Sequence, residues 1–171
     1  MCLLTVTVLQ TTLLFFKTEK TIINPPELKQ SYWVEGNTFS PAYLEEMALY
    51  FSHLLLDVSA ANVLYQGDVL LRYVASNEYG HFKAKLLEEQ KRLKAENVSL
   101  NFNPVDCVVV PGQMTVDVNG DLHTFVSDKK ISQHRETYRV VFTGKAGRLF
   151  LKSFQLIKTA HPEENKNDAT S

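Results

Sequence analysis

Four polar side chains have the strongest potential for chemistry in this 171-residue chain: Asp117, Asp121, His123 and Tyr138. A carboxylate and a tyrosine that converge in a pocket can perform acid/base catalysis, as small cone-shaped isomerases do. However, Asp117, Asp121 and His123 alternate with apolar residues and share one parity. Because side chains alternate between the two faces of a strand, this pattern indicates a solvated face. A catalytic site is therefore the alternative hypothesis, and we expect no enzyme.

Metal, cofactor and nucleic-acid chemistry have little support in the sequence. No glycine-rich phosphate loop or nucleophile elbow is present. The formal charge of −1 and the pI near 6.5 give no basic field for nucleic acid. We expect no metal, no cofactor and no direct nucleic-acid contact. The histidines lack a partner at metal-ligand spacing, and they are His53, His81, His123, His134 and His161.

An uncharged apolar run from Cys2 to Phe16 precedes a domain of ordinary composition. A membrane-spanning helix needs about 20 apolar residues, so the run is short. It lacks the basic start and small-residue cleavage site of a secretory signal. An edge strand or buried helix of the domain is another interpretation. We favour the outer end of a membrane helix over residues 1–17, with lipid contacts made by Leu3, Leu4, Val6, Val8, Leu9, Leu13, Leu14, Phe15 and Phe16.

Residues 18–39 contain Pro25 and Pro26 and show no sustained periodicity, which predicts an extended linker. Aromatic residues at its end could cover the domain or contact a membrane or partner, and packing is the simpler interpretation. The exposed side of the helix that follows is a second candidate contact surface. The candidate interaction residues of both regions are Tyr32, Trp33, Phe39, Tyr43, Glu46 and Tyr50.

Three helices are predicted after this linker. Ser40 followed by Pro41 is typical of a helix start, and apolar residues then recur at three- and four-residue steps as far as Val58. Ser59 can cap a second, shorter helix with Gly67 in its middle. The third is expected from about residue 78 to residue 98, with a thin apolar stripe and a charged, solvated face.

Beyond Val98 the apolar period changes from helical to alternating, which predicts four strands. The first covers about residues 100–110. The second keeps its parity through Asn119 and Gly120, so we predict one long strand and not a hairpin there. Turns are expected at residues 127–130 and 144–147, each followed by a further strand.

Helices first and strands second predict an α+β domain over residues 40–157, in which three helices pack on a curved, four-stranded antiparallel sheet. The shape is cone-like. The polar tail, residues 158–171, is expected to be disordered. A cone filled by Met, Leu and Phe side chains would favour a scaffold, whereas an open pocket with convergent polar groups would favour an enzyme or a ligand-binding module.

An ordered series of segments between Ser40 and Ile157 is similar to TraE, the inner-membrane component of F-type conjugative transfer systems. The segments are YLEEMALYFSHLLLDVSAANV, LLRYV, KLLEEQKRLKAENVS, MTVDVNGDLHTFVSDKK and FLKSFQLI. The resemblance implies one membrane helix, a cytoplasmic amino end and a periplasmic domain with the nuclear transport factor two like cone fold. It also implies a structural part of a bacterial type IV secretion machine, which contacts copies of itself and other inner-membrane and periplasmic subunits. The family offers no catalytic residues.

Two alternatives to this scaffold hypothesis stay open at the level of sequence. The first is a membrane-tethered cone-fold enzyme or small-ligand-binding module. The second is a soluble cone domain whose first segment belongs to its own core.

Overall fold

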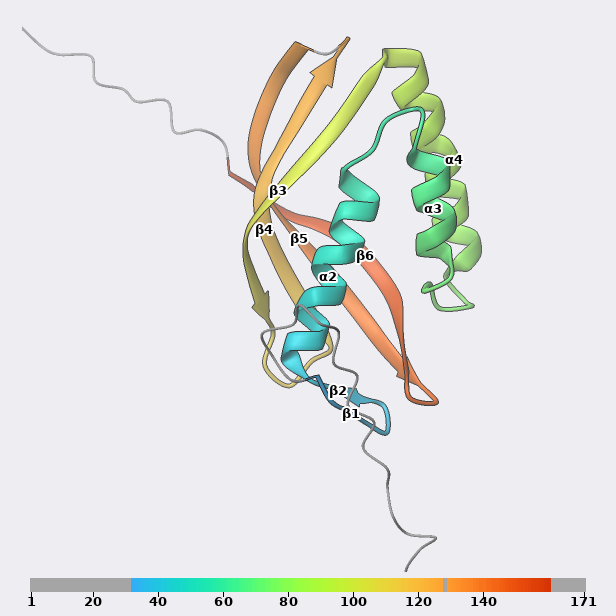
Figure 1. Ribbon diagram of the computed structural model, residues 1–171, viewed down its shortest axis with the longest axis vertical. Helices are drawn as coiled ribbons and strands as arrows, with labels where there is room; N and C mark the ends of the chain where they lie inside the picture. Colours follow the sequence, from blue (N-terminus) through green and yellow to red (C-terminus); the bar gives the residue numbers. More distant parts are fainter. Residues whose placement is uncertain (1–31, 128, 161–171) are drawn as a thin grey trace, which may run out of the picture.

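The computed structural model describes residues 32–127 and 129–160, so the apolar run and residues 161–171 lie outside it. A small hairpin and three helices precede one four-stranded sheet (Figure 1). Among the described residues no helix has both the length and the apolar character needed to cross a membrane. The elements are β1 (Val34–Glu35), β2 (Thr38–Phe39), α2 (Pro41–Leu56), α3 (Val63–Leu71), α4 (Tyr79–Glu96), β3 (Val98–Val109), β4 (Thr115–Val126), β5 (Lys129–Lys145) and β6 (Arg148–Ala160).

Helix α2 starts where the sequence predicts. The Ser40 hydroxyl accepts a hydrogen bond from the Tyr43 N–H at 3.3 Å, and Pro41 occupies the first helical position. The helix buries Leu44, Ala48 and Phe51 among other residues. It lies across one face of the sheet, while α3 and α4 stand together beside it (Figure 1).

The predicted start of the second helix is wrong by several residues. Helix α3 begins at Val63, after Asn62, and Ser59 belongs to the loop before it. The reason is that Ser59 is the donor in the local hydrogen bond and not the capping acceptor. Its main-chain N–H donates to Asn62 Oδ1 at 2.7 Å, and this bond turns the chain before the helix begins. Gly67 allows α3 to approach α4, because a Cβ there would lie 2.9 Å from Leu86 Cδ1.

The sheet has the order β3-β4-β5-β6, and all its neighbouring strands are antiparallel. The long second strand is confirmed, since β4 runs unbroken through Asn119 and Gly120. The following turns are also confirmed: β4 and β5 are joined at Ser127, which has a φ of +46°, and β5 and β6 at Ala146 and Gly147, which also have positive φ. Irregular register at several points bends the strands, as bulges do.

The end of the expected linker is folded. Strands β1 and β2 pair through Val34 with Phe39, and the hairpin contacts β5, where a Cβ on Gly144 would lie 2.5 Å from the Asn37 carbonyl oxygen. At the other end, β6 extends to Ala160, into the segment expected to be a polar tail. The expected α+β architecture of three helices on a four-stranded antiparallel sheet is confirmed.

The core lies between the helices and one face of the sheet. Its main cluster contains Phe51, Leu70, Phe102 and Leu151, all of which are almost completely buried. A smaller cluster of Val58, Val63, Leu93 and Val98 packs where α3 and α4 meet the start of β3. These clusters fix the helices on the sheet and leave the opposite sheet face and both sheet edges as candidate contact surfaces.

Candidate interaction surfaces

The four residues of the acid/base hypothesis do not converge. Asp117 and Asp121 lie on the outer face of β4, where each accepts a pair of hydrogen bonds from an arginine directly opposite on β5. Arg139 contacts Asp117 at 2.8 and 2.7 Å, and Arg135 contacts Asp121 at 2.6 and 3.0 Å. Bidentate pairs of this kind use the acceptor capacity of the carboxylates and hold β4 and β5 in register.

His123 and Tyr138 are also separated from each other. The His123 ring lies over Phe125 on the outer face, with ring centroids 6.5 Å apart. Tyr138 is buried on the helix-facing side, and its hydroxyl donates a hydrogen bond to Glu136 Oε2. Burial and this neighbouring carboxylate raise the pKa of Tyr138 above its ordinary value. The four residues therefore do not form one catalytic group.

The pH dependence of stability tests the ion pair between Asp121 and Arg135 on the outer face of the sheet. Hydrogen bonds from Arg135 hold the pKa of Asp121 below its ordinary value of 3.8. A lowered pKa in the folded state stabilises the fold above the ordinary value, and this contribution is lost as the pH falls through the lowered value. We expect Arg135→Gln to reduce the free energy of unfolding slightly at pH 7, and the difference from the unmodified chain to vanish near pH 2. Urea unfolding at both pH values measures it, and an equal difference at both would contradict this origin.

A groove of about 890 Å³ opens between α4 and the sheet. Leu86 on α4 and Leu122, Phe154 and Leu156 on the sheet supply apolar surface. Glu136 and Tyr138 form a polar pair in its lining. The cone is therefore packed at its centre and open on this side, so it has features of both alternatives, the filled scaffold and the open pocket. Glu136 and Tyr138 were not paired by sequence reasoning, although their i, i+2 spacing on a strand places them on one face.

The predicted interaction residues fall into two environments. Tyr32 and Phe39 are buried, and both rings pack on Tyr43 with centroids 5.8 Å apart. These rings join the hairpin to α2, as the packing interpretation predicts. Trp33 and Tyr43 are half-buried. The exposed members are Glu46 and Tyr50, which lie on α2.

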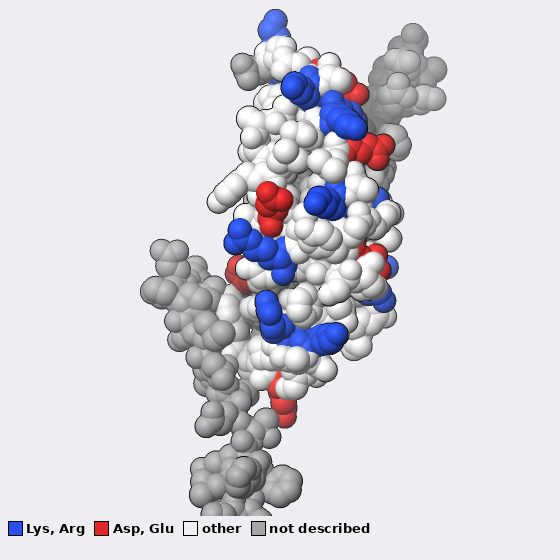
Figure 2. Space-filling model, turned by 90° about the vertical axis from the view of Figure 1, so that its right-hand side faces the viewer, with Lys and Arg blue, Asp and Glu red and all other residues white. Residues whose placement is uncertain are grey.

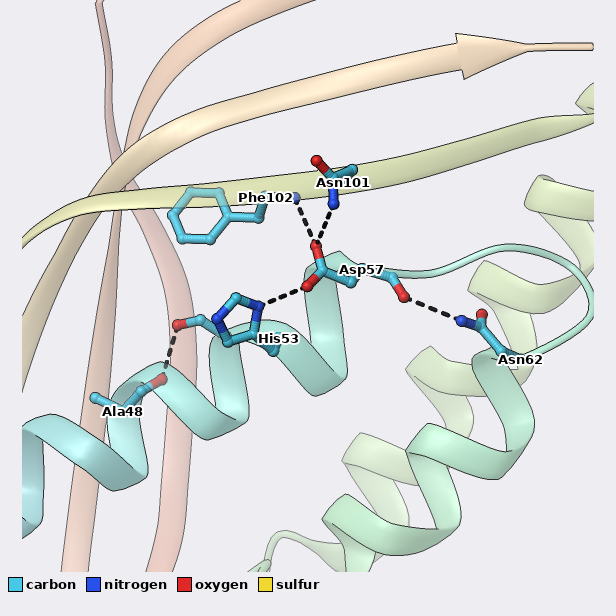
Figure 3. A network of polar contacts seen from close by, with 7 residues as sticks. Ala48, His53, Asp57, Asn62, Asn101 and Phe102 are labelled. Carbon is cyan, nitrogen blue, oxygen red and sulfur yellow. Dashed lines mark hydrogen bonds and ion pairs between the residues drawn. The ribbon is translucent and has the colours of Figure 1, made fainter. Parts of the chain in front are cut away.

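A polar network centred on Asp57 connects the end of α2 to the edge of the sheet (Figure 3). Asp57 Oδ1 accepts hydrogen bonds from the Phe102 N–H at 2.6 Å and from Asn101 Nδ2 at 3.3 Å. Its Oδ2 lies 2.5 Å from His53 Nδ1, and its main-chain carbonyl accepts from Asn62 Nδ2 at 3.1 Å. No local sequence signal predicts these contacts, because Asp57 and Phe102 are 45 positions apart.

Opposite charges are separated between the elements of the domain. Residues 32–71 and 97–127 contain no Lys or Arg, so β1, β2, α2, α3, β3 and β4 have only acidic charges. Lys and Arg are confined to α4, β5, β6 and the loops beside them within residues 32–160. Figure 2 shows several of these cations, with acidic residues among them, on the side of the molecule that bears α3, α4 and β6. The strand order thus gives the sheet an acidic half, β3 and β4, and a cationic half, β5 and β6.

No group of three or more His, Cys, Asp or Glu residues that could hold a metal ion is found in the described ranges. Cys107 is free and half-buried on β3. Burial raises the pKa of its thiol to about 12, with the carboxylates of Glu45 and Asp106 as further causes. This thiol stays protonated at neutral pH and is a poor nucleophile.

Two solved structures have the same fold. VirB8 of Agrobacterium tumefaciens matches 71% of this chain and 93% of its own chain, with a TM-score of 0.58 at 13% sequence identity. An IcmL-like type IV secretion system protein of Legionella pneumophila matches 72% of this chain and 95% of its own, with a TM-score of 0.53 at 10% identity. At these identities the similarity establishes the fold alone.

Sequence relatives point to one family. Protein TraE of Escherichia coli strain K12 is 29% identical over 136 residues, which are 80% of this chain and 72% of that protein. Protein TraE of Salmonella typhi is 27% identical over 71% of this chain and 65% of its own length. The family model described as TraE protein matches residues 1–156. The resemblance found in the sequence is confirmed, and this chain belongs to the TraE family.

Proposed function

We propose that this chain is a structural, non-enzymatic subunit of a type IV secretion machine that transfers DNA by conjugation. The observation that carries the proposal is the family match over residues 1–156. The fold shared with VirB8 and with an IcmL-like type IV secretion protein supports it independently of close sequence similarity. In this proposal the subunit acts through contacts with copies of itself and with other subunits in the inner membrane and periplasm.

The arrangement of the domain supports a contact role over a catalytic one. The outer-face carboxylates are engaged by arginines, and the polar pair of the groove is engaged within itself. The surfaces left for partners are the exposed side of α2, with Glu46 and Tyr50, and the two sheet edges. The apolar residues of segment 1–17 are proposed to hold the protein in the bacterial inner membrane as a single pass, with the domain in the periplasm.

The groove favours a second candidate function, a small-ligand-binding module of the same machine. Its volume of about 890 Å³ falls in the range of small-molecule sites, and Glu136 with Tyr138 could orient a ligand. The two candidates differ in what the polar pair does. A structural subunit needs the two side chains only for packing, whereas a binding module needs the Glu136 carboxylate and the Tyr138 hydroxyl to contact the ligand.

The proposal is tested in cells that carry a conjugative system whose own TraE gene has been deleted. Two differently tagged copies of the full chain are supplied, membranes are crosslinked, and transfer frequency is measured. We expect restored transfer, and crosslinked products that contain both tags and other subunits of the machine. Recovery of the chain only as an isolated monomer would contradict the structural role.

A variant of the polar pair separates the two candidates in the same assay. Glu136→Gln together with Tyr138→Phe keeps the shape of both side chains and removes the carboxylate and the hydroxyl. We expect near-normal transfer for this double variant. A large loss of transfer with normal protein levels would favour the ligand-binding module.

A further inference from the structure

The two edge strands of the sheet, β3 and β6, differ in how their main chain is protected. On β3 the Leu100 N–H donates to the Val58 carbonyl at 2.8 Å, and the Phe102 N–H donates to Asp57. Pro104 has no N–H, and the Cys107 N–H donates to Asp106 Oδ1 at 2.9 Å. Local partners and a proline therefore block most of this edge against the addition of another strand.

The β6 edge is partly covered as well. Leu151 exchanges hydrogen bonds with the chain between α3 and α4: its N–H donates to the Tyr73 carbonyl at 2.6 Å, and its carbonyl accepts from the Ala75 N–H at 3.0 Å. Beyond Leu151 no main-chain bond to the outer side of β6 is found among the described residues up to Ile157. This part of the strand runs beside the groove.

Each edge strand exposes two large apolar side chains. On β3, Val105 and Val108 are 59% and 52% exposed, and on β6, Leu156 and Ile157 are 50% and 44% exposed. Exposed apolar residues with charged neighbours occur at protein contact surfaces. The charges at the two edges are opposite in sign.

The acidic edge contains Asp106 beside Val105 and Val108. Glu45 and Glu46 of α2 add to the negative field there, because, in addition to burial, both carboxylates raise the pKa of the Cys107 thiol together with Asp106. The cationic edge contains Lys152, and Arg148 lies near its start. The only acidic residue of β5 and β6 is Glu136, which is buried, so it offsets little of this charge at the surface.

We propose that copies of this chain associate head to tail, with the β3 edge of one copy against the β6 edge of the next. The inference rests on the self-association in the proposed function and specifies the surfaces. Asp106 of one copy faces the Lys152 region of its neighbour, and the exposed valines of β3 cover Leu156 and Ile157. Because the β3 main chain is blocked, side chains make this contact and the sheets do not merge.

Charge favours this pairing over a symmetric one. A twofold contact between two β6 edges would instead bring cations together, and one between two β3 edges would bring carboxylates together. Heterologous contacts of this kind close into rings or continue as filaments.

A cysteine-pair experiment in cells tests this pairing. In the full chain with Cys2→Ser and Cys107→Ser, one tagged copy receives Val108→Cys and a second, differently tagged copy receives Ile157→Cys. A short bismaleimide crosslinker is then added. We expect crosslinked products that contain both tags, and none between two copies of the same tag. Products between identical copies, or none of any kind from copies that still co-purify, would overturn the head-to-tail contact and leave the proposed function intact.

Charge reversal provides the second measurement on the same cysteine pair. Asp106→Lys on the Val108→Cys copy, or Lys152→Glu on the Ile157→Cys copy, should reduce the yield of mixed product roughly tenfold, because like charges then meet. Combining the two reversals should restore the yield. Asp68→Lys, an exposed reversal on α3, is the matched control and should leave the yield unchanged. Failure of the combined reversal to restore the product would overturn the proposed charge pairing.

Discussion

Replacing Gly120 by alanine is expected to lower the free energy of unfolding by about 3 kcal/mol, and Tm by roughly 10 °C. A Cβ at this position would lie 2.5 Å from the Asn103 carbonyl oxygen and 2.5 Å from Cζ of Phe102. The first contact is with main chain that belongs to the β3–β4 pairing, and the second is with a ring that is almost completely buried. Neither neighbour can move without disturbing the core. The steric cost of the added methyl group therefore exceeds the stabilisation that alanine gives by reducing the conformational entropy of the unfolded chain.

Gly80 on α4 is the matched control, because a Cβ there has no neighbour within 4 Å. Gly80→Ala should leave stability unchanged or raise it by up to about 1 kcal/mol, since alanine favours helix. Thermal unfolding of the full chain in detergent, followed by circular dichroism, compares both variants. Equal behaviour of the two would show that the glycine in β4 is not required by packing.

The sequence correctly predicts that β4 continues as one strand through Asn119 and Gly120. Asn119–Gly120 is a strong turn signal taken alone, but the apolar residues keep one parity on both sides of it, and a turn there would have moved one half of them to the wrong face. The structure explains the glycine: it sits opposite Pro104 on β3, where the Phe102 ring fills the space of a side chain. Periodicity over twelve residues therefore outweighed a two-residue signal.

Features that depend on distant contacts could not be predicted in this way. Ser59 and Asn62 are three positions apart, and both residue types are favourable at the N-cap of a helix. The sequence alone does not show which of them occupies the N-cap, because this depends on the conformation of the loop. The groove depends on how far the strands bend, which bulges set and composition does not. The sequence shows that acidic and basic residues lie in different segments. Only the strand order, which puts β3 and β6 at opposite edges of the sheet, shows that the two edges differ in charge.

Asp57 is the clearest example of a residue whose position makes sense only in three dimensions. It lies at the C-terminal end of α2, where the helix dipole disfavours a negative charge. His53, one turn earlier, reduces this penalty by contact with Oδ2. The remaining carboxylate oxygen is directed at the Phe102 N–H on β3 (Figure 3). We infer that the acidic residue is placed here to close the sheet edge.

Asp57→Ala should therefore lower the free energy of unfolding by about 3 kcal/mol, because it leaves the Phe102 N–H without its charged acceptor and releases Asn101. Hydrogen exchange of the Phe102 amide should accelerate, and the opened edge should promote aggregation. Asp57→Asn retains an acceptor and should recover most of the stability. His53→Ala removes only the solvent-exposed contact and should cost less than about 1 kcal/mol. If Asp57→Asn is as unstable as Asp57→Ala, the charge matters more than the hydrogen bond to β3, and the edge-closing role of Asp57 fails.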